Sequence, residues 1–175
     1  NLDLRVFFLP ESGRSVERSN YKSSLGVQRT SAIGKILEKA GNSPVKPEND
    51  DVLIIVTYPE ALAEMVVSKK TLDTRTLVLE KDQTIVVSEI EKALRELGFK
   101  EVDYVYEPGQ FALRGSILDV YSYSCEYPYR VDFFGDEVDS VRTFQVEDQL
   151  SLDARDRVEI VPELEASDAA QEPFL

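Results

Sequence analysis

Apolar runs and helical spacings alternate along the first part of the chain. The run 6–9 is apolar and stops at Pro10, which predicts a short buried strand. Residues 10–24 are polar and predict a loop. A helix is predicted over about 27–40, because its apolar side chains recur on one face and Gly41 can cap its end. The residues on that face are Ile33, Ile36, Leu37 and Ala40.

A second strand and a second helix are predicted after a Pro- and Asn-containing loop at 42–51. The β-branched run 52–56 has no polar side, which is typical of a central strand in a parallel sheet. Pro59 stands where a helix can begin. The expected buried side of that helix consists of Ala61, Leu62, Met65 and Val66. Strand, helix, strand and helix in this order predict an α/β architecture.

The pattern changes after Leu72. Residues 76–87 predict extended chain around a polar turn at 80–83. Ser88 and Glu91 have the spacing of a capping box, which predicts the start of another helix. The apolar face of this helix, and the glycine that ends it, are Ile90, Ala93, Leu94, Leu97 and Gly98.

The chain from residue 103 onward alternates between apolar and polar positions as antiparallel strands do. Gly135-Asp136 is a two-residue hairpin turn signal between two of these strands. The strands are predicted at 103–107, 110–122, 129–134 and 137–144. This second part therefore reads as a small α+β domain. Residues 165–175 are polar and small, and predict either a tail or the first turn of a further element.

Composition places the chain among ordinary globular proteins. It has 175 residues, of which 42% are hydrophobic and 30% are charged. No apolar run approaches the roughly 20 residues that span a bilayer. The chain begins at Asn1 rather than Met and has no signal peptide, so we expect a piece of a longer protein.

Two residue types are too scarce for most catalytic chemistry. The chain has no histidine, which excludes a Ser-His-Asp triad, a histidine base and a histidine-ligated metal within it. It has one cysteine, Cys125, so an internal disulfide and a cysteine metal cluster are also excluded. We interpret Cys125 as a small turn residue rather than a nucleophile.

The acidic charge is concentrated in the second part of the chain. The net charge is -13, and residues 76–175 hold 9 Lys+Arg against 23 Asp+Glu. A field of this sign repels phosphates, which dominate nucleic-acid affinity. It favours solubility, or contact with a basic protein surface.

Nucleotide and metal chemistry find no support in the motifs. The phosphate-loop pattern is absent, since Gly34-Lys35 lies within the predicted helix 27–40 and Ile36 follows it. The run 52–56 resembles the strand before a magnesium-binding acid, but no carboxylate follows it directly. The acids at positions 136, 137 and 139 lack the spacing of a calcium loop and fit a solvated hairpin turn.

The hairpin sequence 130–134 carries the most informative pattern. Side chains alternate between the two faces of a strand. If Val131 and Phe133 point inward with Val138, then Arg130, Asp132 and Phe134 point outward. An exposed Phe beside an Arg is typical of a protein-binding hot spot. Alternatively, Asp132 or Asp139 neutralises Arg130, and another element covers Phe134.

Arg114 is a second arginine on a predicted strand. Gly115 follows it and indicates a bulge or a close approach of two backbones. The side chain of Arg114 either projects toward a partner or pairs with one of the many nearby acids. The pattern alone favours the second, structural interpretation.

Two blocks around these arginines resemble one family. Residues 106–120 read YEPGQFALRGSILDV, and residues 130–144 read RVDFFGDEVDSVRTF. Both resemble signature blocks of the bacterial transcription-repair coupling factors, with the same 16-residue separation from arginine to arginine. Residues 56–62, VTYPEAL, are similar to the end of that family's first lobe.

The resemblance implies a domain organisation. The N-terminal region of this family is similar to the excinuclease subunit UvrB. This region of the family comprises a degenerate RecA-like lobe with a second domain inserted. Residues 1–73 would be the C-terminal part of that lobe, and 74–164 the inserted domain. Residues 165–175 would be either a tail or a return to the lobe. The expected fold class is α/β plus α+β: a partial RecA-like lobe with parallel strands, followed by a small, mostly antiparallel domain.

The resemblance also implies a function. The inserted domain would be a non-catalytic docking module for UvrA that mimics UvrB, with the family's UvrA-contacting positions at Arg114, Arg130 and Phe134. The parent would be a cytoplasmic, ATP- and magnesium-dependent DNA translocase, whose motor and whose RNA polymerase and DNA contacts lie elsewhere. An intramolecular contact would mask the docking face. Three alternatives stay open: a fragment of UvrB, a helicase-like fragment with residual nucleotide binding, and a purely structural or autoinhibitory lobe.

Overall fold

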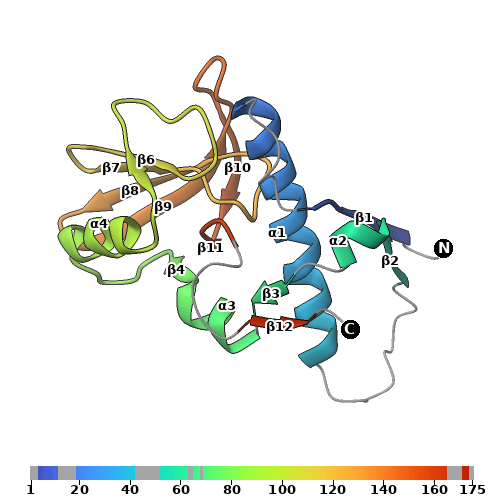
Figure 1. The fold of residues 1–175 in the computed structure, drawn as a ribbon. Helices are drawn as coiled ribbons and strands as arrows, with labels where there is room; N and C mark the ends of the chain where they lie inside the picture. The colour runs from blue at the N-terminus through green and yellow to red at the C-terminus, as the bar shows by residue number, and fades with distance from the viewer. Residues whose placement is uncertain are drawn as a thin grey trace. The chain divides into compact units, whose positions relative to one another are not determined.

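The chain contains two compact units, which are described separately. The structure is a computed structural model, and it describes residues 4–11, 19–41, 52–62, 65–67, 69–164 and 171–173 (Figure 1). The first unit comprises Asn1–Asp73 and Leu164–Leu175, and the second comprises Thr74–Glu163. The predicted loop at 42–51 lies outside the described residues. Parallel strands and helices in one unit and a mainly antiparallel sheet in the other confirm the predicted α/β plus α+β class.

The first unit is built on a parallel strand pair and a long helix. β1 (Leu4–Leu9) pairs in parallel with β2 (Val52–Thr57). α1 (Ser19–Gly41) begins well before the predicted position 27, so the predicted loop is wrong over 19–24. A polar stretch without proline forms a helix as readily as a loop. α1 ends at Gly41, as predicted, and none of the described helices is long and apolar enough to cross a membrane.

One face of the β1–β2 pair is exposed, which corrects the prediction of two buried strands. Val6 is 61% exposed and Val56 is 49% exposed, and Phe8 and Ile54 are exposed on the same face. Leu9 at the end of β1 is buried. β1 and β2 form a two-stranded sheet among the described residues, so β2 has a free edge there rather than two flanking strands.

The rest of the first unit consists of short elements. α2 (Pro59–Leu62) begins at the predicted proline but is only 4 residues long. Met65 and Val66 were predicted on its buried side, yet they belong to the strand β3 (Met65–Val67), which pairs antiparallel with β12 (Gln171–Pro173). Adjacent Val66 and Val67 favour extended backbone, and this pairing outweighs the helical spacing. α3 (Lys69–Arg75) follows β3 along the chain.

The second unit is dominated by a six-stranded sheet in the order β10-β9-β8-β7-β6-β5. Neighbouring strands are antiparallel except for the parallel pair of β5 and β6. A separate antiparallel pair joins β4 to β11. The strands of the unit are β4 (Leu77–Glu80), β5 (Lys100–Glu101), β6 (Gln110–Arg114), β7 (Ile117–Val120), β8 (Tyr129–Phe134), β9 (Glu137–Phe144), β10 (Ser151–Arg155) and β11 (Arg157–Ile160).

Two of the predicted strands need correction. The segment 103–107 is not a strand, because the backbone N–H groups of Tyr106 and Glu107 both donate to the side-chain oxygen of Gln110 and fold the chain into a turn. The predicted strand 110–122 is a hairpin of β6 and β7. It turns at Gly115, whose φ of 62° is readily adopted only by glycine. The predicted strands 129–134 and 137–144 are confirmed with their bounds.

The helix α4 (Val87–Glu96) covers one face of the sheet (Figure 1). It starts after Val86, which makes no side-chain cap hydrogen bond, so the predicted capping box of Ser88 and Glu91 is wrong. Ser88 already lies inside the helix. Gly98 adopts a φ of 86° and ends it as predicted, and the amide of Phe99 closes the turn on the carbonyl oxygen of Leu94 at 2.9 Å.

The core of the second unit lies between α4 and the sheet. Ile90 and Leu94 of α4 are at most 1% exposed, as the predicted apolar face requires. They belong to one cluster with inward residues from the strands, which include Leu79, Phe111, Leu118, Val120, Val131, Val138, Val141, Val158 and Ile160. These fully buried apolar side chains fix the register of each strand, because a shift by one residue would expose all of them.

Candidate functional site: the polar face of the sheet

The hairpin β8–β9 separates apolar and polar side chains as the sequence predicts. Val131, Phe133 and Val138 are buried in the core. Arg130 and Phe134 alternate with these core positions along β8 and therefore lie on the opposite face of the sheet. We call this opposite face, carrying Arg114, Asp119, Arg130, Asp132, Phe134 and Arg142, the polar face.

Phe134 is exposed at the tip of the hairpin. Its side chain is 82% exposed, so the alternative that another element covers it is wrong. The turn after it is formed by Gly135, with a φ of 63°. The adjacent segment 82–85 holds the start of β9, since the amides of Asp82 and Ile85 donate to the carbonyl oxygens of Val138 and Asp136. Phe134 therefore projects from an ordered turn rather than from a loose loop.

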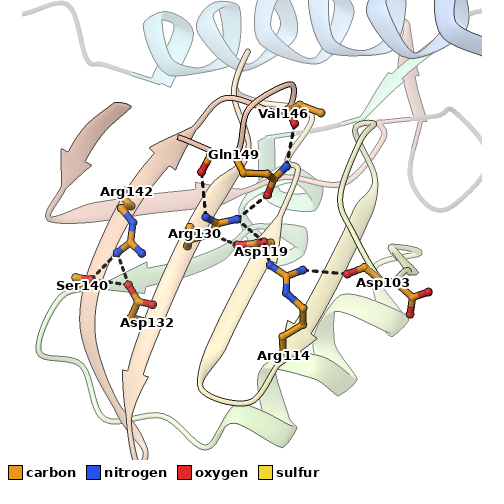
Figure 2. Close-up of polar contacts among 9 residues, drawn as sticks. All are labelled: Asp103, Arg114, Asp119, Arg130, Asp132, Ser140, Arg142, Val146 and Gln149. Carbon is orange, nitrogen blue, oxygen red and sulfur yellow. Dashed lines mark hydrogen bonds and ion pairs between the residues drawn. The ribbon is translucent and has the colours of Figure 1, made fainter. Parts of the chain in front are cut away.

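A single buried carboxylate joins the two arginines named from the sequence. Asp119 on β7 is 1% exposed. Arg130 donates from Nε to Asp119 Oδ1 at 2.7 Å and from Nη2 to Asp119 Oδ2 at 2.8 Å. Arg114 donates from Nη2 to the same Oδ2 at 2.5 Å (Figure 2). Arg130 is thus neutralised by Asp119, not by Asp132 or Asp139 as considered from the sequence.

Each arginine also lies over an aromatic ring. The guanidinium carbon of Arg130 is 4.2 Å from the ring centroid of Phe144, and that of Arg114 is 5.0 Å from the ring of Tyr104. Such stacking contributes roughly 0.5–2 kcal/mol, more where the pair is desolvated. Arg130 is the more enclosed of the two, with 14% of its side chain exposed against 34% for Arg114.

The segment between β9 and β10 closes over Arg130. Gln149 accepts from Arg130 Nη1 at its backbone oxygen (3.3 Å) and from Nη2 at its side-chain oxygen (2.9 Å). The side-chain nitrogen of Gln149, Nε2, donates to the backbone oxygen of Val146 at 2.9 Å. Gln149 has a φ of 62°, a region that few residues other than glycine occupy. These contacts hold the loop in place although its backbone is strained.

A second ion pair lies on the same face. Arg142 on β9 donates from Nη1 to Asp132 Oδ2, and also to Ser140 Oγ at 3.1 Å. Ser140 donates to the same carboxylate at 3.0 Å. Arg142 is the cross-strand neighbour of Arg130. Two like charges thus lie opposite each other on β8 and β9, and each is held by its own carboxylate, Arg130 by Asp119 and Arg142 by Asp132 (Figure 2).

The polar face is less acidic than the unit around it, although Glu137 lies opposite Phe134. Residues 74–163 contain 10 Lys+Arg and 20 Asp+Glu. Three arginines of this face meet only two of those acids, Asp119 and Asp132. The hydrogen bond to Asp119 raises the pKa of Arg130 and outweighs the lowering by burial, so this guanidinium stays charged. The partly exposed guanidinium of Arg114 is suited to a carboxylate on a partner protein.

An open depression of about 600 Å³ adjoins Arg114. Its lining consists of Glu101, Val102, Asp103, Tyr104, Leu113 and Arg114. No group of three or more His, Cys, Asp or Glu side chains that could hold a metal ion occurs among the described residues. Cys125 is half-buried and packs against the core, close to Tyr129.

The sequence named the three candidate docking residues of the face, and Asp132, but missed three residues that organise it. Asp119, Gln149 and Arg142 were not singled out. Asp119 did leave a signal, because it is the charged residue in the strand 117–120, whose other members are apolar. A charge inside such a strand needs a buried partner, and the two nearby arginines are the obvious ones. The contacts of Gln149 depend on loop geometry that no sequence pattern shows.

These features define a class of site. A sheet face with a rigidly held arginine pair and a fully exposed aromatic residue at an ordered tip has the make-up of a protein-docking surface. The fold that carries it is a small α+β domain with its own core. The second unit is, on this basis, a protein-interaction domain.

Comparison with known proteins identifies that domain. Residues 77–165 match the family model described as the UvrB interaction domain, and this segment is half of the chain. The chain belongs to the UvrB interaction domain family. It therefore carries a docking module of the kind found in DNA repair factors.

Several proteins similar to the chain are transcription-repair coupling factors. The chain is 33% identical over 109 residues to the factor of Escherichia coli K12, an alignment that covers 62% of the chain and 10% of that protein. It is 30% identical over 114 residues to the factor of Bacillus subtilis 168, covering 65% of the chain and again 10% of the relative. The resemblance inferred from the two blocks is confirmed, and the chain spans about a tenth of these relatives.

A more distant relative bears on the UvrB alternative. The chain is 26% identical over 140 residues to the UvrABC system protein B of Fervidobacterium nodosum, an alignment that covers 79% of the chain and 21% of that protein. This longer but weaker similarity makes a UvrB fragment the less favoured alternative. It also agrees with a fold shared by the two kinds of repair factor.

Proposed function

We propose that residues 74–164 recruit UvrA to a bacterial transcription-repair coupling factor, and that UvrA docks on the polar face at Arg114, Arg130 and Phe134. The observation that carries this proposal is the 82% exposure of Phe134 beside the Asp119-linked arginines. An exposed aromatic side chain has no stabilising role in the isolated unit, whereas aromatic residues and Arg dominate the energy of protein interfaces.

The mode of recruitment follows from the kinship with UvrB. A coupling factor that offers UvrA the same face as UvrB can bind UvrA without any other shared feature. Binding and release at this face need no covalent chemistry, and the docking module itself is non-catalytic in this proposal. Its site comprises Phe134 for apolar burial and the Asp119-linked arginine pair, which presents a guanidinium to carboxylates on UvrA.

The rest of the parent protein is assigned by the same kinship. Residues 1–73 would belong to a degenerate RecA-like lobe, to which residues 165–175 return. The parallel strands β1 and β2 with α1 are compatible with such a lobe. ATP with magnesium, the translocase motor, and the RNA polymerase and DNA contacts would belong to other parts of a parent in the bacterial cytoplasm. An intramolecular contact would mask the polar face until UvrA is needed.

A calorimetric titration of the chain with purified UvrA at two salt concentrations tests the proposal. We expect saturable binding that weakens at higher salt, because charged groups take part. Phe134→Ala and Arg114→Ala should each weaken it. Two controls match these changes: Tyr127→Ala, an exposed aromatic beyond the opposite end of β8, and Arg95→Ala, a paired arginine on α4. Wild-type protein that is folded but does not bind UvrA would contradict the proposal.

The purely structural alternative has one observation in its favour, since both arginines are paired internally. It predicts that all four substitutions leave UvrA binding unchanged, or that the chain does not bind at all. A nucleotide titration separates the enzyme alternative. The docking proposal expects no saturable ATP binding, whereas a residual nucleotide site requires it.

A further inference from the structure

We propose that Arg130 is a positioning residue: together with Asp119 it aligns Arg114, and Arg114 and Phe134 make the contacts with the partner. This inference rests on the proposed docking function and divides the roles within that site. It also assigns the chemistry that the site recognises, which is a carboxylate next to an apolar side chain on the partner protein.

The hydrogen bonds of Arg130 are nearly all used inside the protein. A guanidinium has five N–H donors. Four of its hydrogen bonds go to Asp119 and to Gln149. Its remaining face lies over the ring of Phe144. With 14% of the side chain exposed, Arg130 has little left to offer a partner unless the loop carrying Gln149 opens.

Arg114 has the opposite balance. Within the described part of the chain it makes two hydrogen bonds, to Asp119 and to the backbone oxygen of Asp103 at 3.0 Å. Three of its five N–H donors therefore face neither acceptor. Its side chain is 34% exposed and lines the open depression beside β5. A carboxylate of the partner can reach these donors without displacing any internal contact.

Asp119 is the element that couples the two arginines. Its Oδ2 accepts from both guanidiniums, and its Oδ1 is held by Arg130 Nε. The carboxylate is 1% exposed, so water does not compete for it. The fork of Arg130 fixes the plane of this carboxylate, and that plane fixes the direction in which Arg114 is held. Loss of Arg130 therefore misaligns Arg114, although Arg130 itself does not touch the partner.

The loop over Arg130 supports the same division. Gln149 keeps a φ of 62° and directs both of its oxygens at Arg130. A contact residue would be expected to keep its donors open, whereas this arginine is closed over on the solvent side. The charge of Arg130 is thus used to hold Asp119 in the fold, and the charge of Arg114 is the one left for the partner.

Double-mutant cycles in UvrA binding test the inference. Arg114→Ala, Arg130→Ala and Phe134→Ala are made singly and in pairs, and each dissociation constant is measured by calorimetry. We expect about tenfold weaker binding for Arg114→Ala and a similar or smaller loss for Arg130→Ala. In the Arg114→Ala background, Arg130→Ala should change the constant less than about twofold, because the residue through which it acts is already gone.

The cycle with Phe134 controls for damage to the fold. If Arg130 acts only through Arg114, the factor lost with Phe134→Ala should be the same with or without Arg130. Arg130→Gln is the second variant, because it leaves a donor near Asp119 if the alanine protein fails to fold. Asp119→Asn should weaken binding like Arg130→Ala, and it too should add nothing in the Arg114→Ala background.

The outcomes separate the two proposals. Losses for Arg130 and Arg114 that multiply in the double variant would mean that Arg130 contacts UvrA directly, and would overturn the inference while the docking function stands. A wild-type chain that does not bind UvrA overturns both. The positioning role is established by two results together. The Arg114→Ala/Arg130→Ala variant binds UvrA about as well as Arg114→Ala alone, and the affinity losses of Arg130→Ala and Phe134→Ala multiply in their double variant.

Discussion

The two faces of the six-stranded sheet are made by the same strands but are ordered by different forces. On the face toward α4, apolar side chains such as Phe111, Leu118 and Val131 are 0–1% exposed and exclude water. On the polar face, ion pairs order the side chains: Asp119 is 1% exposed between two arginines, and the more exposed Asp132 pairs with Arg142. Apolar packing is non-directional, whereas ion pairs with hydrogen bonds fix the direction of each group.

This difference explains how one small unit combines stability with recognition. The core face supplies most of the folding energy and can be judged by unfolding experiments. The polar face supplies direction, because its guanidiniums are already fixed before a partner arrives. Preorganised groups lose little conformational freedom on binding, so a smaller entropic cost offsets the contacts that they make. Substitution of an apolar core residue should therefore mainly lower stability, whereas substitution of an exposed residue such as Phe134 should mainly weaken binding.

The largest expected effect is on the core face. Phe111 is fully buried, so Phe111→Ala should lower the free energy of unfolding by about 3–5 kcal/mol. Urea denaturation followed by circular dichroism measures this, since the chain has no tryptophan. A loss below about 1 kcal/mol would mean that the core is not organised around this residue.

The same truncation on the polar face should behave in the opposite way. Phe134→Ala should change the unfolding free energy by less than about 0.5 kcal/mol, because the side chain is 82% exposed. UvrA binding should weaken about 30-fold, the equivalent of roughly 2 kcal/mol for an interface anchor. Calorimetry and thermal unfolding on the same samples give both numbers. Equal binding by the variant, or a large loss of stability, would break the contrast between the faces.

Alkaline pH should weaken the core face through one tyrosine. Burial raises the pKa of Tyr129, and the nearby Cys125 adds to this effect. Above about pH 10 the unfolded chain loses the phenol proton while the folded chain keeps it. The contribution of Tyr129 to stability is therefore complete below that pH and falls above it by about 1.4 kcal/mol per pH unit.

Tyr129→Phe removes this titration and is the matched control. The variant should lose less stability than the wild type between pH 10 and the higher pKa of the folded protein. Denaturant midpoints measured across this range give the comparison. Identical pH dependence in both proteins would show that Tyr129 is not the group responsible.

The smallest effect is expected at the turn that joins β8 and β9. Gly135 has a φ of 63° and open space where a Cβ would lie, so Gly135→Ala should destabilise by about 1–2 kcal/mol through backbone strain alone. Gly135→Asn should cost less, because Asn tolerates this region. Thermal unfolding distinguishes the two. An alanine variant as stable as the asparagine variant would argue against a strained turn.

Sequence reasoning predicted local periodicities best. The strands of the β8–β9 hairpin, its turn at Gly135 and the helix end at Gly98 follow from alternation and from glycine conformation. Some of the failures arise from contacts between distant segments. Met65 and Val66 form a strand because residues 171–173 pair with them, and no local pattern contains that partner.

The candidate site could be predicted in part for the same reason. Alternation placed Arg130 and Phe134 on one face, and the structure shows this arrangement. The enclosure of Arg130, which distinguishes it from Arg114, depends on Asp119, 11 residues before it, and on Gln149, 19 residues after it. A pattern of side-chain types cannot distinguish an arginine that is held on all sides from one with open donors.

A competition experiment tests the central claim most directly. Labelled UvrB is bound to UvrA, and the displaced fraction is measured by fluorescence anisotropy as the chain is added. We predict that the wild-type chain displaces UvrB completely, and that Phe134→Ala requires about 30-fold more protein. Wild-type chain that binds UvrA without displacing UvrB, or that does not bind at all, would contradict docking through a face shared with UvrB.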